Sequence, residues 1–299
     1  MPRRNLDIIY VGHNISVLES LINEDRIHIK GVIVEDDKAN SNIQNIAESK
    51  NMLFHRVRND DELDDAIAEN GSFDVMLVSG FGYILKERML QHASVANINI
   101  HYSYLPFYKG RHPVRRVLMN VERRTGITAH VIDKSIDTGP IVSRISIDID
   151  RKENYLSLCG KMEKYIPKVI GDIVEYCLKP EELVFIDNEG GTYYPPVDYE
   201  RECRIDWSED VEKIAFLIRS QYGGRGAYTE CDAKRLYVSA VDDVKVRNGR
   251  NNMKSFKNSG EVVCIKGKTV SIVCGDARVV DVVFSGDGLK LIRVGSVLG

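Results

Sequence analysis

The sequence contains no long apolar run, no recognisable secretory leader and no clustered metal ligands. Its longest stretch without Asp, Glu, Lys or Arg, residues 89–108, is interrupted by Gln, His, Asn, Ser and Pro, which excludes a membrane span. The first apolar run, residues 6–12, is too short for the core of a signal peptide. The six cysteines form no C-x-x-C pair and none is spaced with a histidine as in a zinc site, so we expect reduced thiols in a cytoplasmic protein.

A surplus of one charge is also missing, since 41 Lys and Arg residues face 44 Asp and Glu residues and leave a net charge of -3. This balance argues against a protein that coats nucleic acid or a membrane through bulk charge. A G-x-G-x-x-G loop is absent as well, because Gly12-His13-Asn14 follows the first apolar run, and a nicotinamide enzyme is therefore not favoured. With 43% hydrophobic residues, the chain has the composition of a globular protein.

The first part of the chain alternates short apolar runs with segments of helical spacing. Strands are predicted at residues 8–11, 29–34, 53–57, 75–78 and 95–100. Helices are predicted between them at residues 17–22, 39–50, 60–70 and 84–92. This alternation predicts an α/β fold, a Rossmann-like doubly wound parallel sheet whose ligands bind at the carboxyl ends of the strands.

The remainder of the chain changes character in two steps. Residues 154–178 predict one long helix, and residues 179–204 predict a linker because Pro and Gly concentrate there. Beyond a helix at 209–220, short alternating runs are typical of a small OB-like β-barrel: 236–238, 262–265, 269–274, 279–284 and 289–294. The predicted organisation is a catalytic domain at residues 1–178, a linker at 179–204 and a barrel domain at 205–299.

The pattern with chemical meaning lies in residues 97–142. Asn99 and His101 are two positions apart at the end of a predicted central strand, so their side chains project from the same face. An amide N–H can hold a developing oxyanion and an imidazole can move protons, which suits acyl transfer. Asp137, in a later loop, could return to orient or charge the imidazole. An isolated Asn-x-His is usually structural, but its combination with the motifs that follow is far more specific.

Three motifs follow one another in order. Residues 99–110 read Asn-Ile-His-Tyr-Ser-Tyr-Leu-Pro-Phe-Tyr-Lys-Gly, residues 125–128 read Thr-Gly-Ile-Thr, and residues 137–139 read Asp-Thr-Gly. The chain thereby resembles the 10-formyltetrahydrofolate-dependent formyltransferases, with Tyr104 and Lys109 in place of the family's usual Leu and Arg. The resemblance implies that Asn99, His101 and Asp137 are the catalytic trio, that 10-formyltetrahydrofolate is the formyl donor, and that no metal is needed.

The resemblance and the neighbouring charges also assign binding residues. Two loops are implied to line the pterin pocket of the folate: Phe81, Gly82, Tyr83, Ile84, Leu85, Thr138, Gly139, Pro140 and Ile141. The acceptor is expected to contact Ser103, Lys109, Gly110, Arg111 and Arg115. Lys109, Arg111, Arg115 and Arg116 form a basic cluster that could grip a pyrophosphate, although a solvated loop and helix start would contain the same residue types.

The identity of the acceptor depends on two other segments. Residues 204–207, Arg-Ile-Asp-Trp, resemble the entry to the barrel domain of methionyl-tRNA and amino-arabinose formyltransferases. Where the tRNA enzymes carry a basic loop, residues 35–40 read Glu-Asp-Asp-Lys-Ala-Asn, and acidic side chains repel phosphate. We therefore expect the primary amine of a nucleotide-linked amino sugar as acceptor, with methionyl-tRNA as the alternative.

Two further classes stay open at this stage. A formyltetrahydrofolate hydrolase would use water in place of the amine, and a catalytically silent nucleotide- or RNA-binding module would rest on the barrel, although the intact trio argues against the latter. Nucleic acid is not the favoured partner, but a C-terminal part with 16 Lys and Arg against 12 Asp and Glu from residue 204 onward leaves tRNA open. No membrane partner is expected, and the sequence does not define an oligomeric state.

Overall fold

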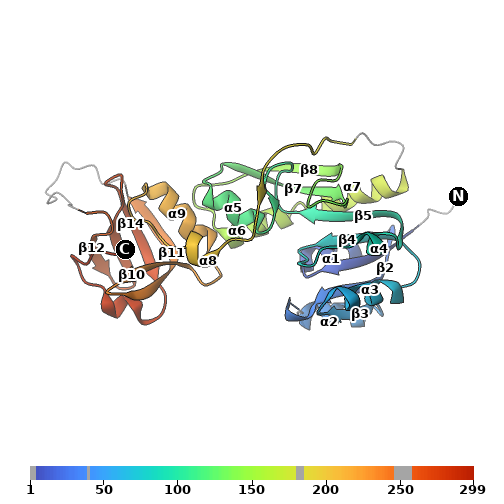
Figure 1. Cartoon of the computed structure of the whole chain (residues 1–299), viewed down its shortest axis with the longest axis horizontal. Helices are drawn as coiled ribbons and strands as arrows, with labels where there is room; N and C mark the ends of the chain where they lie inside the picture. The colour runs from blue at the N-terminus through green and yellow to red at the C-terminus, as the bar shows by residue number, and fades with distance from the viewer. Residues whose placement is uncertain (1–4, 39–40, 180–184, 246–257) are drawn as a thin grey trace. The chain divides into compact units, whose positions relative to one another are not determined.

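The computed structural model describes residues 5–38, 41–179, 185–245 and 258–299, which form two compact units (Figure 1). The first lies within residues 1–110, 125–147 and 161–193, and the second within 111–124, 148–160 and 194–299. Residues 180–184 of the predicted linker, and Ala39 and Asn40 of the acidic segment, lie outside the described residues. The predicted domain boundaries at 178 and 205 stay a prediction.

The first unit is built on a seven-stranded sheet with the order β3-β2-β1-β4-β5-β7-β8. Its strands are β1 (Leu6–Gly12), β2 (Ile27–Glu35), β3 (Leu53–Val57), β4 (Phe73–Ser79), β5 (Ala93–His101), β7 (Arg124–Val131) and β8 (Ile141–Asp148). The pairs from β3 to β5 are parallel, whereas β7 runs antiparallel to β5. The predicted α/β fold with a mostly parallel sheet is confirmed.

Helices connect these strands and bury their apolar residues. They are α1 (Ile15–Ile22), α2 (Ser41–Ser49), α3 (Asp60–Glu69), α4 (Glu87–Leu90) and α7 (Ile166–Leu178), with a short 3₁₀ helix at Asp36–Lys38. Ile9 and Val11 of β1 pack with Leu63 and Ile67 of α3 in one core cluster, while α1 and α7 pack against each other. β4 is buried along its whole length, as a central parallel strand should be.

The carboxyl ends of β1, β4 and β5 share one edge of the sheet because these strands run parallel. At this edge Gly12 has a φ of +145°, and a Cβ there would lie 2.0 Å from the carbonyl oxygen of Ser79. Only glycine permits so close an approach between the two strand ends. The loops that follow β1, β4 and β5 therefore leave the sheet side by side.

The second unit contains a five-stranded antiparallel sheet with the order β10-β11-β14-β13-β12 (Figure 1). Its elements are α5 (Pro113–Met119), α8 (Tyr199–Glu202), α9 (Val211–Ser220), β10 (Ala227–Cys231), β11 (Lys234–Lys245), β12 (Val262–Lys266), β13 (Thr269–Val273) and β14 (Val279–Phe284). Trp207, Ile214 and Ile218 pack with Val238 and Val280 in its core. Among the described strands no pairing joins β10 to β12, so the sheet is open and the predicted OB-like barrel is not confirmed.

Several elements differ from the sequence prediction for identifiable reasons. The long helix predicted at 154–178 is two helices, α6 (Tyr155–Glu163) and α7, because Pro167 occupies the first turn of α7 and cannot continue a preceding helix. The helix predicted at 84–92 shrinks to α4. The strand predicted at 289–294 is wrong, since a 3₁₀ helix at Gly286–Leu291 reaches into it.

The predicted linker also contains regular structure. Its residues form α8 and β9 (Tyr193–Tyr194), which pairs with β6 (Lys109–Gly110) in a two-stranded sheet. None of the helices in the described ranges has both the length and the apolar character that crossing a bilayer requires.

Candidate active site

Asn99 and His101 end strand β5, and their cross-strand neighbours come from β7. Asn99 pairs in register with His130, and His101 pairs with Thr128. The amide nitrogen Nδ2 of Asn99 lies 3.1 Å from Nε2 of His130. His101 and His130 are both buried, with 8% and 3% of their side chains exposed. The edge of the sheet therefore presents two imidazoles and one amide.

Asp137 joins this group from the loop between β7 and β8. Its Oδ1 lies 3.2 Å from Asn99 Nδ2 and 3.3 Å from His130 Nε2, and its Oδ2 lies 3.5 Å from His101 Nδ1. The backbone N–H of Gly110 donates to Oδ2 at 2.8 Å. The structure thus brings together the three residues predicted as the catalytic trio, with His130 and Gly110 as further partners of the carboxylate.

The electrostatics of Asp137 favour the ionised carboxylate. Burial alone raises its pKa, but the charge of His101, the hydrogen bond and charge of His130, and the Gly110 amide together hold the pKa well below its usual range. The carboxylate is therefore charged throughout the physiological pH range. An ionised carboxylate at this position can receive a proton released nearby.

The tautomers of the two histidines follow from their carbonyl partners. His101 Nε2 lies 2.8 Å from the carbonyl oxygen of Tyr108, and His130 Nδ1 lies 2.9 Å from that of Val131, so each of these nitrogens must carry a proton. The other nitrogen of each ring, Nδ1 of His101 and Nε2 of His130, faces the carboxylate of Asp137. The Asn99 amide nitrogen lies 3.1 Å from His130 Nε2 and 3.2 Å from Asp137 Oδ1, so the amide must turn away from at least one of them before it can hold a substrate oxygen.

His130 is the residue that the sequence analysis does not single out, because none of the three motifs contains it. The available signal is its position two residues after Thr128, in the Thr-Gly-Ile-Thr segment, which places both side chains on one face of the strand. The register that sets His130 opposite Asn99 is visible only in the folded sheet.

The first loop predicted to hold the folate follows β4 directly. Phe81 and Tyr83 form an edge-to-face pair with ring centroids 5.5 Å apart, and Ile84 is 70% exposed. The N–H of Gly82 donates to Glu35 at 2.9 Å, which fixes the loop to the end of β2. Leu85 packs partly against the core. The loop therefore combines a fixed backbone with exposed apolar surface.

The second loop predicted to hold the folate continues from Asp137 into β8. Thr138 donates through its hydroxyl to Asp133 at 2.7 Å, and Pro140 accepts from the N–H of Val131 at 2.9 Å. A Cβ on Gly139 would lie 1.8 Å from the Val131 carbonyl oxygen, so glycine is required there. Ile141 is fully buried at the start of β8. The contacts hold the backbone of this loop against β7.

Three residues predicted to bind the acceptor have structural partners in the first unit. Ser103 donates through its hydroxyl to the carbonyl of Phe107 at 2.7 Å. The ammonium of Lys109, a buried residue, donates to the carbonyls of Asn188 and Gly190 at 2.9 and 3.1 Å. Gly110 serves Asp137 through its N–H. Their geometry favours a role in holding the loops, and acceptor contact by these residues stays a prediction.

The predicted basic cluster does not assemble as a phosphate grip. Arg116 is buried and forms a bidentate ion pair with Glu202. Arg115 donates to the carbonyl of Ser220 and lies 4.0 Å above the ring of Tyr155. Arg111 is exposed. Two of the arginines expected to grip a pyrophosphate are thus committed to contacts within the second unit.

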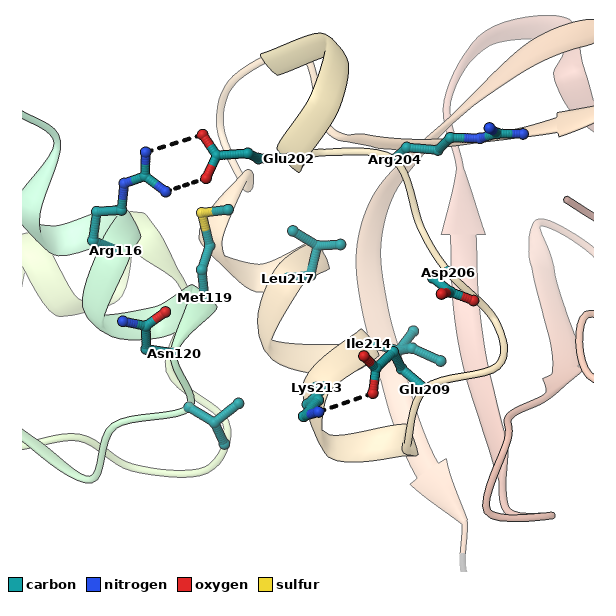
Figure 2. A pocket seen from close by; sticks show the side chains of 11 residues that line it. Arg116, Met119, Asn120, Glu202, Arg204, Asp206, Glu209, Lys213, Ile214 and Leu217 are labelled. Atoms are coloured by element: carbon teal, nitrogen blue, oxygen red, sulfur yellow. Dashed lines mark hydrogen bonds and ion pairs between the residues drawn. The ribbon is translucent and has the colours of Figure 1, made fainter. Parts of the chain in front are cut away.

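A pocket of about 460 Å³ lies in the second unit between α5 and α9 (Figure 2). Figure 2 shows Arg116 and Glu202 facing each other on one side, and Lys213 bonded to Glu209 on the other. Met119 contributes to its apolar lining. Within the described ranges no group of three or more His, Cys, Asp or Glu residues is arranged to hold a metal ion.

Comparison with known proteins gives a consistent assignment. Residues 27–172 match the family Formyl transferase, and residues 199–284 match Formyl transferase, C-terminal domain. The chain is 26% identical over 287 residues to methionyl-tRNA formyltransferase of Caldicellulosiruptor saccharolyticus, covering 89% of this chain and 91% of the relative. It is 30% identical over 260 residues to that of a Thermotoga species, covering 79% of this chain and 80% of the relative.

A solved structure shares the fold at lower identity. The N-formyltransferase of Helicobacter canadensis, determined with folinic acid and dTDP-3-aminofucose, matches with a TM-score of 0.68 and 16% identity. The match covers 94% of this chain and 100% of that one. At this identity the match concerns the fold alone.

Proposed function

Given that the chain belongs to the formyl transferase family, we propose that it transfers the formyl group to the amino group of methionyl-tRNA. It is a folate-dependent formyltransferase whose donor is 10-formyltetrahydrofolate. The observation that carries the choice of acceptor is similarity to methionyl-tRNA formyltransferases along 89% of the chain, including the C-terminal unit. The excess of Lys and Arg from residue 204 onward is compatible with a polyanionic acceptor.

The catalytic roles we propose follow from the contacts of Asp137. The donor supplies an activated formyl group when bound. His101 and Asn99 hold the formyl oxygen as it gains negative charge, after Asn99 gives up one of its present partners. The ionised Asp137 orients His101 and takes up the proton that the amine releases as its nitrogen bonds to the formyl carbon. The bond between that carbon and the folate nitrogen then breaks, and tetrahydrofolate leaves with the proton that Asp137 returns. His130 and Gly110 keep the carboxylate in place while this occurs.

The residues around the sheet edge fit the proposed folate site. Ile84, 70% exposed, belongs to the first loop that the resemblance assigns to the folate, and Ile136, 45% exposed, directly precedes the second. Large apolar side chains exposed on such loops offer a surface for an aromatic ring system. The Phe81–Tyr83 pair, half-buried beside Ile84, extends that surface.

A nucleotide-linked amino sugar is the second candidate acceptor, favoured by the exposed carboxylates after β2. Asp36 and Asp37 are exposed, whereas Glu35 is buried and accepts from Gly82, so two of the three acidic residues face solvent. Negative charge there opposes the approach of a tRNA phosphate backbone. The basic cluster no longer supports this candidate, because Arg115 and Arg116 have partners within the protein.

One experiment separates the candidates. The protein is given 10-formyltetrahydrofolate with charged initiator methionyl-tRNA, with dTDP-3-aminofucose, or with neither, and formylated product and free formate are measured. Formylation of methionyl-tRNA that falls steeply with added salt supports the proposal. Formylation of the sugar alone favours the second candidate, and free formate without any acceptor indicates a hydrolase. Asp137→Asn serves as the inactive control.

A further inference from the structure

The segment that follows α7, which was predicted as a linker, contacts two loops of the candidate active site. One is the loop after β5, and the other is the loop between β7 and β8 that carries Asp137. The N–H of Tyr108 donates to the hydroxyl oxygen of Thr192 at 2.9 Å, and the N–H of Lys109 donates to the Thr192 carbonyl at 2.8 Å. Gly191, with a φ of +79°, approaches Pro106 so closely that a Cβ would lie 1.9 Å from the Pro106 carbonyl oxygen. These contacts attach the segment to the loop that follows β5.

Asn188 attaches the same segment to the loop that carries Asp137. Its side-chain amide donates to the carbonyl of Asp137 at 3.0 Å and to the carbonyl of Gly139 at 2.7 Å. Asn188 is only 5% exposed. Asp137 itself has a φ of +55°, a left-handed conformation that is uncommon for residues other than glycine. The side-chain amide of Asn188 thus fixes the backbone carbonyl of Asp137 by a hydrogen bond.

The contacts close into a ring. Asn188 donates to the Asp137 backbone, the Lys109 ammonium donates to the Asn188 carbonyl at 2.9 Å, and the next residue, Gly110, donates to the Asp137 carboxylate at 2.8 Å. Each member fixes the next, so the position of the carboxylate depends on the segment after α7. Lys109, expected to touch the acceptor, here connects Asn188 to Gly110.

We infer that Asn188 is a positioning residue for catalysis, which acts by holding the backbone of Asp137 so that its carboxylate faces His101. The inference rests on the proposed catalytic role of Asp137. It extends the reaction site to a residue about 50 positions away in the sequence, which touches none of the imidazoles in the described contacts. Loosening Asp137 lowers the rate of the chemical step because misplacement of a reacting group costs turnover. Donor binding weakens less, although Gly139 of the loop assigned to the folate loses the same amide.

The test uses three substitutions and a matched control. Asn188→Ala removes the amide, Asn188→Ser keeps one donor, and Asn188→Asp keeps the shape but sets carboxylate oxygens against two carbonyl oxygens. Asn70→Ala is the control, since Asn70 is 3% exposed, lies in the same unit and donates to the carbonyl of Ala66 at 2.7 Å without touching the trio. For each variant kcat, the KM for the donor, the donor Kd and Tm are measured on the full chain.

We expect Asn188→Ala to lower kcat by about tenfold to a hundredfold and to raise the donor KM and Kd by a clearly smaller factor, because Gly139 of the loop assigned to the folate loses the same hydrogen bond. Asn188→Ser retains more activity, and Asn188→Asp is at least as damaging as Asn188→Ala. Combined with Asp137→Asn, Asn188→Ala lowers the residual rate by less than about twofold, because the two residues act as one unit. If Asn188→Ala fails to fold, Asn188→Ser and its double variant supply the same comparison.

The outcomes separate this inference from the proposed function. A wild-type kcat for Asn188→Ala, a milder effect of Asn188→Asp than of Asn188→Ala, or fully multiplicative losses in the double variant would overturn the positioning role. An equal kcat loss in Asn70→Ala would do the same, since the effect would then be general destabilisation. If instead Asp137→Asn keeps full activity, the proposed catalytic role fails independently of any result at Asn188.

Discussion

The substitution Asp137→Asn tests the charge of the site with almost no change of shape. Both carboxylate oxygens face nitrogen donors, since Oδ2 accepts from the Gly110 N–H and Oδ1 accepts from the Asn99 amide. An asparagine offers one oxygen and one NH2 group, so either orientation sets its NH2 against an N–H of Gly110 or of Asn99. One hydrogen bond is therefore lost and one buried donor is left unpaired.

The size of the effect follows from these contacts. A hydrogen bond to a charged group contributes about 1.5–3 kcal/mol, so we expect Asp137→Asn to lower the free energy of unfolding by about 1–3 kcal/mol at pH 7. Burial raises the pKa of the Asp137 carboxyl group in the folded state, but His101, His130 and Gly110 outweigh this effect, so the pKa is lowered overall. Its stabilisation is therefore complete above the pKa of an unfolded Asp, about 3.9, and is lost as pH falls below that value.

The assay is chemical denaturation of wild type and variant at pH 7, 5 and 3.5, together with turnover at pH 7. We expect the stability difference to be equal at pH 7 and 5 and smaller at pH 3.5, and turnover to fall by about a hundredfold or more. A stability difference that grows as the pH falls would refute the assignment of a lowered pKa. Full turnover in Asp137→Asn would refute the catalytic role.

Three further predictions concern other parts of the chain. His130→Phe removes the second imidazole beside Asp137, and we expect kcat to fall about tenfold with an unchanged donor KM; an unaltered kcat would contradict its role. Ile84→Glu, at a residue that is 70% exposed, should raise the donor KM while changing the free energy of unfolding by less than about 0.5 kcal/mol, and an unchanged KM would remove the residue from the folate site. Limited proteolysis should cut first between residues 179 and 204, and preferred cutting inside 75–100 would contradict the predicted domain boundaries.

Local sequence patterns predicted the bounds of some helices and strands better than those of others. The strands at 53–57 and 279–284 were predicted with the bounds that the structure shows. The helix at 84–92 and the strand at 289–294 were predicted from apolar spacing alone. The structure has only the short helix α4 in the first range, and the 3₁₀ helix at Gly286–Leu291 extends into the second. Barrel closure could not be judged from strand count, since an open sheet contains the same alternating runs.

The sequence predicted only those residues of the candidate site that lie within the recognised motifs. Asn99, His101 and Asp137 were identified from the motifs and the resemblance that they carry, and the structure brings Asn99 and His101 each within hydrogen-bond or ion-pair distance of Asp137. His130 and Asn188 were not identified, because their contribution depends on the register of β7 against β5 and on the return of the chain after α7. A short motif specifies neither the register between two strands nor the path of the segment that follows α7.

The same distinction explains why the motifs predict the chemistry better than the acceptor. All contacts described for Asn99, His101 and Asp137 come from residues of the first unit, so the reacting geometry is set by one sheet edge and three loops. Transfer of a formyl group needs only this geometry, whichever amine attacks. Selection of the amine requires contacts outside the motifs, and the arginines adjacent to them, Arg115 and Arg116, are already bonded within the second unit. The catalytic trio alone therefore does not identify the acceptor, which is why similarity along the whole chain is a stronger guide to it than the trio.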